Sequence, residues 1–362
     1  MSATVDGPPA ASAAAAASTP PPVAAAVDAA SAPRLVNDVD AATLRIISLL
    51  PSATEIVCAL GLRPLGVTHE CDYPPDIVRG LPVVTSSSIP SDAASCEIDA
   101  LVTEKVASKG RKPLYSLILP VVQRLAPTAI VTQALCDVCA VDTCVVERAA
   151  ADLPSSPTVI NLEPSTLGEV IDSITTLAAA LGVPRLSRPV VDSLNARVDV
   201  VRQRTAAALM AGTIPRRRRV FIAEWIDPLF TCGHWTPELV DLAGGVEVAA
   251  VAGQRSARSS VAALVPLAPE VLFVALCGFG VERSMQDVPI LQAAPGFDDL
   301  PAAASGDVYV TDGNAYFSRS GPRLVDSLEI LAHTLYPDVH PLPPGLPPAV
   351  RVGKKGGEAV GE

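Results

Sequence analysis

The sequence predicts an α/β protein of two lobes, each with a mainly parallel central sheet flanked by helices, and the lobes joined by one long helix. Its 362 residues are enough for two domains of ordinary size. Short continuous apolar runs alternate with helical patterns, which is typical of parallel sheets covered on both faces. Between two series of such runs, residues 187–211 have no strand signal and place apolar side chains three and four positions apart. A helix of that length, about 37 Å, is long enough to connect two lobes.

The elements follow in order along the chain. The expected strands are 45–50, 64–68, 82–85, 128–133 and 158–162 in the first lobe, and 219–224, 271–276 and 307–311 in the second. The stretch "PSATEIVCALG" predicts a helix, with Ser52 and Glu55 at the spacing of a capping box and Gly61 at its end. The expected domain limits are 1–43 for a disordered Ala/Pro-rich segment, 44–186 and 216–341 for the lobes, 187–215 for the linking helix and 342–362 for a disordered tail.

Composition limits the class of partner. The net charge is −11 and no long basic face is present, so nucleic acid is not expected as a partner. No apolar stretch approaches the roughly 18–20 residues of a membrane span. The first basic residue is Arg34, which does not fit a secretory signal or a transit peptide, so the sequence predicts a cytoplasmic protein. In that compartment the eight cysteines are expected as buried thiols, metal ligands or catalytic groups.

The residues that are hardest to explain as core follow directly after strands. They lie in the loops 68–75, 134–144, 224–235 and 312–323, two in each lobe. Ligands of open parallel sheets bind outside the carboxyl ends of the strands, so these loops predict a cleft between the lobes. The expected ligand contacts are Glu70, Asp72, Trp225, His234, Trp235, Tyr316, Phe317 and Arg319. Arg323 stands at a helix start, where the dipole disfavours a cation, and therefore needs an acidic partner or a ligand.

The stretch "VTQALCDVCAVDTC" leaves three interpretations open. By itself its cysteine spacing matches no complete zinc or iron–sulfur site. Together with neighbouring loops it could form a metal or thiol-reactive site, with Cys136, Cys139, Cys71 and His69 as ligands. In that case Glu224 and Asp227 are the acid–base candidates. The other two interpretations are thiols that pack the loop and a CxxC redox pair, which nearby acidic residues would oppose.

Four segments carry a family resemblance. In this order, "RIISLLPSATEIVCALG", "VTHECDYPP", "DPLFTCGHW" and "YFSRSGPR" resemble the class III (Fe/B12-type) periplasmic binding proteins of ABC importers, over residues 44–340. The cobalamin-binding branch and its cobalamin-binding-like relatives that lack a signal peptide look most similar. The resemblance implies a class III two-lobe fold and a corrinoid or other metal chelate as ligand. It also implies contacts from Glu70 and from 315–319, although Glu70 and Ser86 replace aromatic residues and Ala315 replaces an acid.

The resemblance also bears on the partner. Binding proteins of this class dock on a permease through one acid on each lobe; Asp99 matches the first, but no carboxylate is available near Ala262 for the second. Docking on an ABC permease is therefore not expected. The favoured function is an intracellular, non-catalytic binding protein for a cobalamin-like corrinoid or another metal chelate. The alternative is a metal- or thiol-dependent enzyme, or a metal-handling protein, that uses the Cys/His/acid groups of the same cleft.

Overall fold

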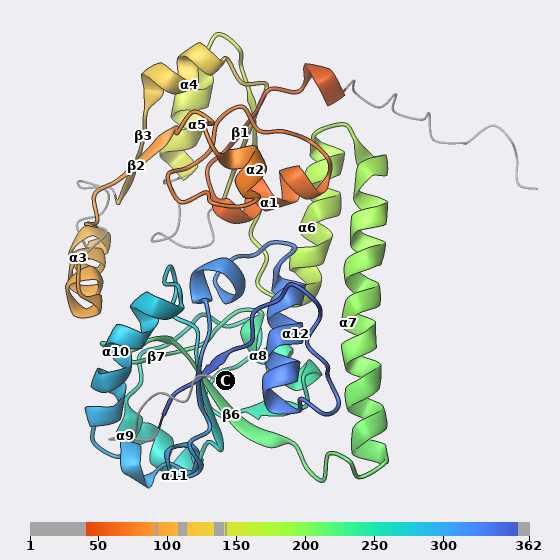
Figure 1. The fold of residues 1–362 in the computed structure, drawn as a ribbon. Helices are drawn as coiled ribbons and strands as arrows, with labels where there is room; N and C mark the ends of the chain where they lie inside the picture. The colour runs from red at the N-terminus through yellow and green to blue at the C-terminus, as the bar shows by residue number, and fades with distance from the viewer. Residues whose placement is uncertain (1–40, 91–92, 108–113, 134–140, 142, 354–362) are drawn as a thin grey trace, which may run out of the picture. The chain divides into compact units, whose positions relative to one another are not determined.

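The structure is a computed structural model that describes residues 41–90, 93–107, 114–133, 141 and 143–353. The chain divides into the units Met1–Asn37 and Asp38–Glu362, and every described residue belongs to the second. The elements before the long helix α7, here called the N-terminal half, are η1 (Ala41–Thr43), β1 (Ile46–Ser48), α1 (Pro51–Ala59), α2 (Pro75–Val78), β2 (Thr85–Ser87), α3 (Ser95–Ala107), β3 (Tyr115–Leu117), α4 (Leu119–Leu125), β4 (Ala129–Thr132), α5 (Thr143–Ala151), β5 (Thr158–Asn161), α6 (Leu167–Ala180) and η2 (Pro184–Leu186) (Figure 1).

The long helix α7 spans Ser187–Met210. The elements after it, here called the C-terminal half, are β6 (Arg218–Trp225), β7 (Phe230–Thr231), α8 (Thr236–Leu242), β8 (Gly245–Glu247), α9 (Val261–Leu264), η3 (Val265–Leu267), β9 (Val271–Val274), α10 (Val281–Ala293), η4 (Phe297–Asp299), α11 (Pro301–Ser305), β10 (Val308–Val310), η5 (Gly313–Phe317), α12 (Leu324–Leu335) and β11 (Val350–Arg351). In the described ranges, no helix has the length and apolar character that a bilayer-spanning segment needs.

The N-terminal half contains a parallel sheet in the order β1-β4-β5 and a separate antiparallel pair of β2 and β3. The runs 64–68 and 82–85 were expected as full strands. They contribute only the isolated parallel pairings of Ile47 with Gly66 and of Val67 with Val83, together with Thr85, which begins β2.

The sheet of the C-terminal half follows the order β11-β10-β9-β6-β7, and β8 also pairs with β6. The strands β10, β9, β6 and β8 run parallel, whereas β7 and β11 are antiparallel edges. Strand β11 lies in the segment expected to be a disordered tail from 342. There Val352 is buried against the face of the sheet formed by Phe221 and Leu272, so apolar burial holds this part of the chain in place.

One hydrophobic cluster runs through both halves. On β4, Val131 belongs to it while Ile130 faces a second cluster, and on β6, Ile222 belongs to it while Phe221 faces a third. Because neighbouring side chains of a strand point to opposite faces, both sheets are covered on both sides. The helix α7 contacts α6 from the N-terminal half and both α8 and α12 from the C-terminal half. The α/β architecture with two sheets and one long connecting helix is thus confirmed (Figure 1).

Candidate functional site

A cluster of charged side chains joins loops of the two halves. It consists of Glu55, Asp72, Asn314, Arg319 and Arg323 and is called the arginine–carboxylate cluster below. Arg319 donates to both oxygens of Asp72, at 2.5 and 2.9 Å, and to Glu55 Oε1 at 3.2 Å. Asn314 completes the arrangement, since its Nδ2 donates to Asp72 at 3.1 Å and its Oδ1 accepts from Arg319 at 3.0 Å.

Arg323 explains the unfavourable cation at a helix start. Its Nε and Nη2 donate to the two oxygens of Glu55, at 3.1 and 2.6 Å. Its guanidinium also lies 4.0 Å from the centroid of the Tyr73 ring and 5.8 Å from that of Tyr316. The acidic partner expected from the sequence is therefore Glu55 of α1. The capping-box interpretation of Glu55 is wrong, because α1 is preceded by Leu50 as N-cap and has no side-chain cap.

Burial sets the energetics of the cluster. The side chain of Arg319 is 6% exposed, that of Glu55 only 2%, and that of Asp72 52%. Burial raises the pKa of Asp72, but its bonds to Arg319 outweigh this and leave the pKa below its ordinary value. Likewise burial lowers the pKa of Arg319, and the bonds to Asp72 more than restore it. Both groups are therefore ionised at neutral pH.

A turn at the end of β10 positions the cluster. Residues Gly313–Phe317 form a single π-helical turn, and Asp312 Oδ1 accepts from the backbone N–H of Ala315 at 2.7 Å to cap it. Such turns are frequent at functional sites. A Cβ at Gly313 would overlap the carbonyl oxygen of Leu276, so only glycine permits this close approach to the end of β9.

The expected aromatic contacts divide into two groups. Trp235 and Phe317 are 6% and 3% exposed, and the indole Nε1 of Trp235 donates to the carbonyl oxygen of Phe317 at 2.9 Å. These two side chains therefore support the turn from its buried side and present no open face. Tyr316 and Trp225 are half-buried, and Tyr73 is 41% exposed.

Phe279 is an aromatic residue that sequence reasoning missed. Its ring centroid lies 5.0 Å from that of Trp225, and the guanidinium of Arg283 lies over the ring at 4.3 Å from its centroid. It follows the apolar run of β9, so its position at the carboxyl end of a parallel strand was the available signal.

The described cysteines and histidines do not form a metal centre. Across the described residues, no three His, Cys, Asp or Glu side chains gather closely enough to hold a metal ion. Cys136 and Cys139 lie outside those residues. Cys71 Sγ lies 3.0 Å from Thr54 Oγ1, and burial raises its pKa to about 11, so it is a neutral thiol.

The two loop histidines are engaged differently. His69 Nδ1 lies 2.8 Å from Thr85 Oγ1, and its Nε2 lies 3.2 Å from Glu70 Oε1 without the geometry of a hydrogen bond. The proximity of His69 lowers the pKa of Glu70. Burial lowers the pKa of His234, which is therefore neutral at pH 7. Glu70 and Thr85 also line a small pocket of ≈ 10 Å³.

Both acid–base candidates take part in local hydrogen bonds. Glu224 Oε1 accepts from the backbone N–H of Gly233 at 3.0 Å, which uses its carboxylate to hold the following loop. The main-chain oxygen of Asp227 accepts from Trp225 Nε1 at 3.0 Å. In the same region, Glu247 is a buried carboxylate with a strongly shifted pKa. Burial raises it to about 7, although backbone N–H groups of Ala249 and Ile222 donate to it.

Glu247 predicts a specific pH dependence of stability. The folded protein binds this proton more tightly than the unfolded chain, so the stabilisation is full below pH 4.5 and is lost as the pH rises through about 7. We expect Glu247→Gln to exceed the wild type in free energy of unfolding by about 2 kcal/mol at pH 8, and by much less at pH 5. Urea unfolding at both pH values, with the exposed Glu282→Gln as control, measures this. An unchanged pH dependence in Glu247→Gln would contradict it.

One family model and many solved structures resemble this chain, and three of the structures are described here. Residues 150–315 match the family described as "Periplasmic binding protein". The periplasmic heme-binding protein RhuT from Roseiflexus sp. RS-1, in its apo form, is similar over 82% of this chain and 99% of its own, with a TM-score of 0.60 and 22% identity. A periplasmic heme binding protein from Pseudomonas aeruginosa is similar over 86% and 99%, with a TM-score of 0.63 and 20% identity. The periplasmic vitamin B12 binding protein BtuF of Vibrio cholerae is similar over 80% and 96%, with a TM-score of 0.54 and 22% identity.

The chain has the class III periplasmic-binding-protein fold. No curated protein matches its sequence. The fold confirms the resemblance expected from the four sequence segments. The expected cytoplasmic location is wrong, because the matching family and these structures are periplasmic binding proteins, which points to a periplasmic or extracellular location.

Two other regions of this class III fold lie apart from the cluster. Asp99, the acid expected for docking, forms an ion pair of 2.6 Å with Arg258 of the C-terminal half, while Ala262 is exposed on α9.

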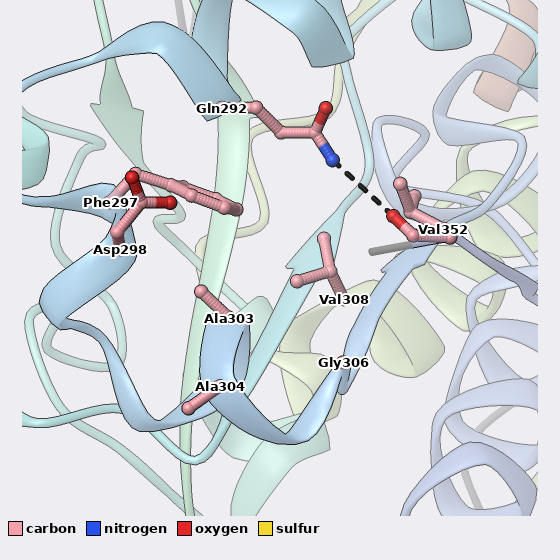
Figure 2. A pocket seen from close by; sticks show the side chains of 9 residues that line it. Gln292, Phe297, Asp298, Ala303, Ala304, Gly306, Val308 and Val352 are labelled. Atoms are coloured by element: carbon pink, nitrogen blue, oxygen red, sulfur yellow. Dashed lines mark hydrogen bonds between the residues drawn. The ribbon is translucent and has the colours of Figure 1, made fainter. Parts of the chain in front are cut away.

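A pocket of ≈ 260 Å³ lies beside β10 and β11, where Gln292 Nε2 donates to the carbonyl oxygen of Gly353 at 3.5 Å (Figure 2). Figure 2 shows Phe297 and Asp298 along the rim of this pocket, which contains none of the expected ligand contacts.

Proposed function

We propose that the chain is a solute-binding protein that takes a planar metal chelate, such as heme or a corrinoid, between its two halves and does not transform it. The observation that carries this is the arginine–carboxylate cluster flanked by Tyr73 and Tyr316. Both halves contribute to it at the ends of their strands, where ligands of parallel sheets bind. The fold is shared with proteins named for binding heme or vitamin B12, which supports this class of ligand.

The proposed contacts follow from exposure. A flat macrocycle is held mainly by aromatic and apolar faces. Tyr73, Tyr316 and Trp225 keep such faces accessible, while polar substituents would meet Glu70 and the cluster. Trp235 and Phe317 would act indirectly, by holding the turn that carries Tyr316. The Nε2 atom of His234 is buried, so a ligand would not contact His234 through this nitrogen.

In the part of the chain that the structure describes, no observation favours the enzyme alternative over the binding protein. Among the described residues the candidate thiols Cys71 and Cys232 are neutral, because burial raises the pKa of both. The proposal also expects no docking on a permease through Asp99, since Arg258 neutralises it and α9 has Ala262 in place of an acid.

A titration with four chelates tests the function. The four chelates are hemin, cyanocobalamin, dicyanocobinamide and ferrioxamine. We expect hemin or cyanocobalamin to bind with one molecule per chain and a dissociation constant of about 1 μM or lower. Absorption spectroscopy and calorimetry measure the binding. Tyr73→Ala should weaken it by about tenfold because an accessible aromatic face is lost. Leu119→Ala, which removes a similarly exposed apolar side chain, is the control. Binding of none of the three planar chelates, or of ferrioxamine alone, would refute the proposal.

A further inference from the structure

The two carboxylates of the cluster are held very differently. Glu55 is almost fully buried and bonds to both arginines, whereas the side chain of Asp72 is 52% exposed and lies at the outer end of the network. Breaking the bonds of Glu55 would leave a buried charge without a partner, which is strongly unfavourable. Asp72 can turn into water at much lower cost, because half of its side chain already faces the solvent.

The partners of Asp72 form a preformed carboxylate site. Arg319 presents its two Nη groups to the two oxygens of Asp72, and Asn314 Nδ2 adds a third donor at 3.1 Å. The guanidinium fork matches a carboxylate in a bidentate manner. Glu55 and Asn314 Oδ1 bond to Arg319 from other directions and fix the fork in place.

We propose that Asp72 stands in for a carboxylate of the ligand, and that a ligand carboxylate displaces it from Arg319 and Asn314. Charge supports the exchange. In the present arrangement Glu55 and Asp72 balance Arg319 and Arg323, and an incoming carboxylate preserves that balance while Asp72 moves into water. A neutral amide would leave the nearly buried Arg319 and Arg323 to share the single carboxylate of Glu55, which is unfavourable. The site therefore selects carboxylate-bearing chelates over amide-bearing ones, provided that the chain binds a chelate as proposed above.

Esterification separates this inference from the proposed function. Hemin carries two carboxylates, and its dimethyl ester has the same ring and metal but no free carboxylate. We expect the wild type to bind hemin at least about tenfold more tightly than the ester. Asp72→Asn should increase the affinity for hemin by about a further tenfold, since the competing carboxylate is gone, and should change the ester affinity far less.

The controls make each outcome decisive. Asp76→Asn removes the same charge from an exposed position on α2, four residues away, and should change neither affinity. Asp72→Ala replaces Asp72→Asn if thermal unfolding shows that the asparagine variant is not folded. Equal binding of hemin and its ester, or an equal gain for both in Asp72→Asn, would overturn the inference while leaving the proposed function intact. Binding of neither compound would overturn the inference, and the proposed function with it if cyanocobalamin also fails to bind.

Discussion

Replacing Glu55 with glutamine is expected to lower the free energy of unfolding by about 3–5 kcal/mol. The side chain of Glu55 is 2% exposed and makes charged bonds to Arg319 and Arg323. Glutamine keeps the shape of the side chain but leaves two buried guanidinium groups to share the single carboxylate of Asp72. Urea unfolding followed by circular dichroism measures the loss.

The matched control is Glu282→Gln, which makes the same change at an exposed position of α10. Such surface changes usually alter stability by less than about 0.5 kcal/mol. A double-mutant cycle with Arg323→Gln then isolates the pair itself, because contacting residues couple non-additively. Equal stabilities for Glu55→Gln and Glu282→Gln would contradict the role assigned to the cluster.

Replacing Gly313 with alanine should destabilise the protein by about 3 kcal/mol or more, since overpacking against rigid neighbours is costly. The new Cβ would overlap the carbonyl oxygen of Leu276 and would lie 2.6 Å from the carbonyl carbon of Ala275. These are backbone atoms of a buried strand end, so neither can move aside as a side chain can. Thermal unfolding measures the effect, and chelate titration should show weakened binding because the turn carrying Tyr316 is displaced.

The control for Gly313→Ala is Gly168→Ala. Gly168 lies in α6, and a Cβ there would have no heavy atom within 4 Å. We expect it to stabilise the protein by about 0.5–1 kcal/mol, because alanine is the better helix former. A Gly313→Ala protein as stable as Gly168→Ala would show that the close approach of the turn to β9 is not real.

Much of the fold could be predicted because helix periodicity and strand ends depend on residues that are close together in the sequence. The stripe of Leu194, Val198 and Val201 indicated the linking helix, and all three are buried. The loops after the strands indicated Asp72 and Arg319, which the structure brings together. Both predictions needed only spacing along the chain and the rule that parallel strands share an edge.

What could not be predicted depends on tertiary packing. Glu55 has the spacing of a capping box, and the sequence does not reveal that its partners lie more than 260 positions away. Trp235 follows a strand like an exposed loop residue, but its indole N–H finds the carbonyl of Phe317 inside the core. The expected cytoplasmic location relied on the charges near the start of the chain, whereas the matching family and structures are periplasmic binding proteins.

In the proposed complex, one chelate contacts both halves at the arginine–carboxylate cluster. Hydrogen–deuterium exchange of the full chain, with and without bound hemin, tests this contact. We expect hemin to slow exchange in the loop containing Asp72 and, at the same time, in the turn Gly313–Phe317. Protection confined to one half, or protection centred on the pocket of Gln292 and Val352, would contradict it.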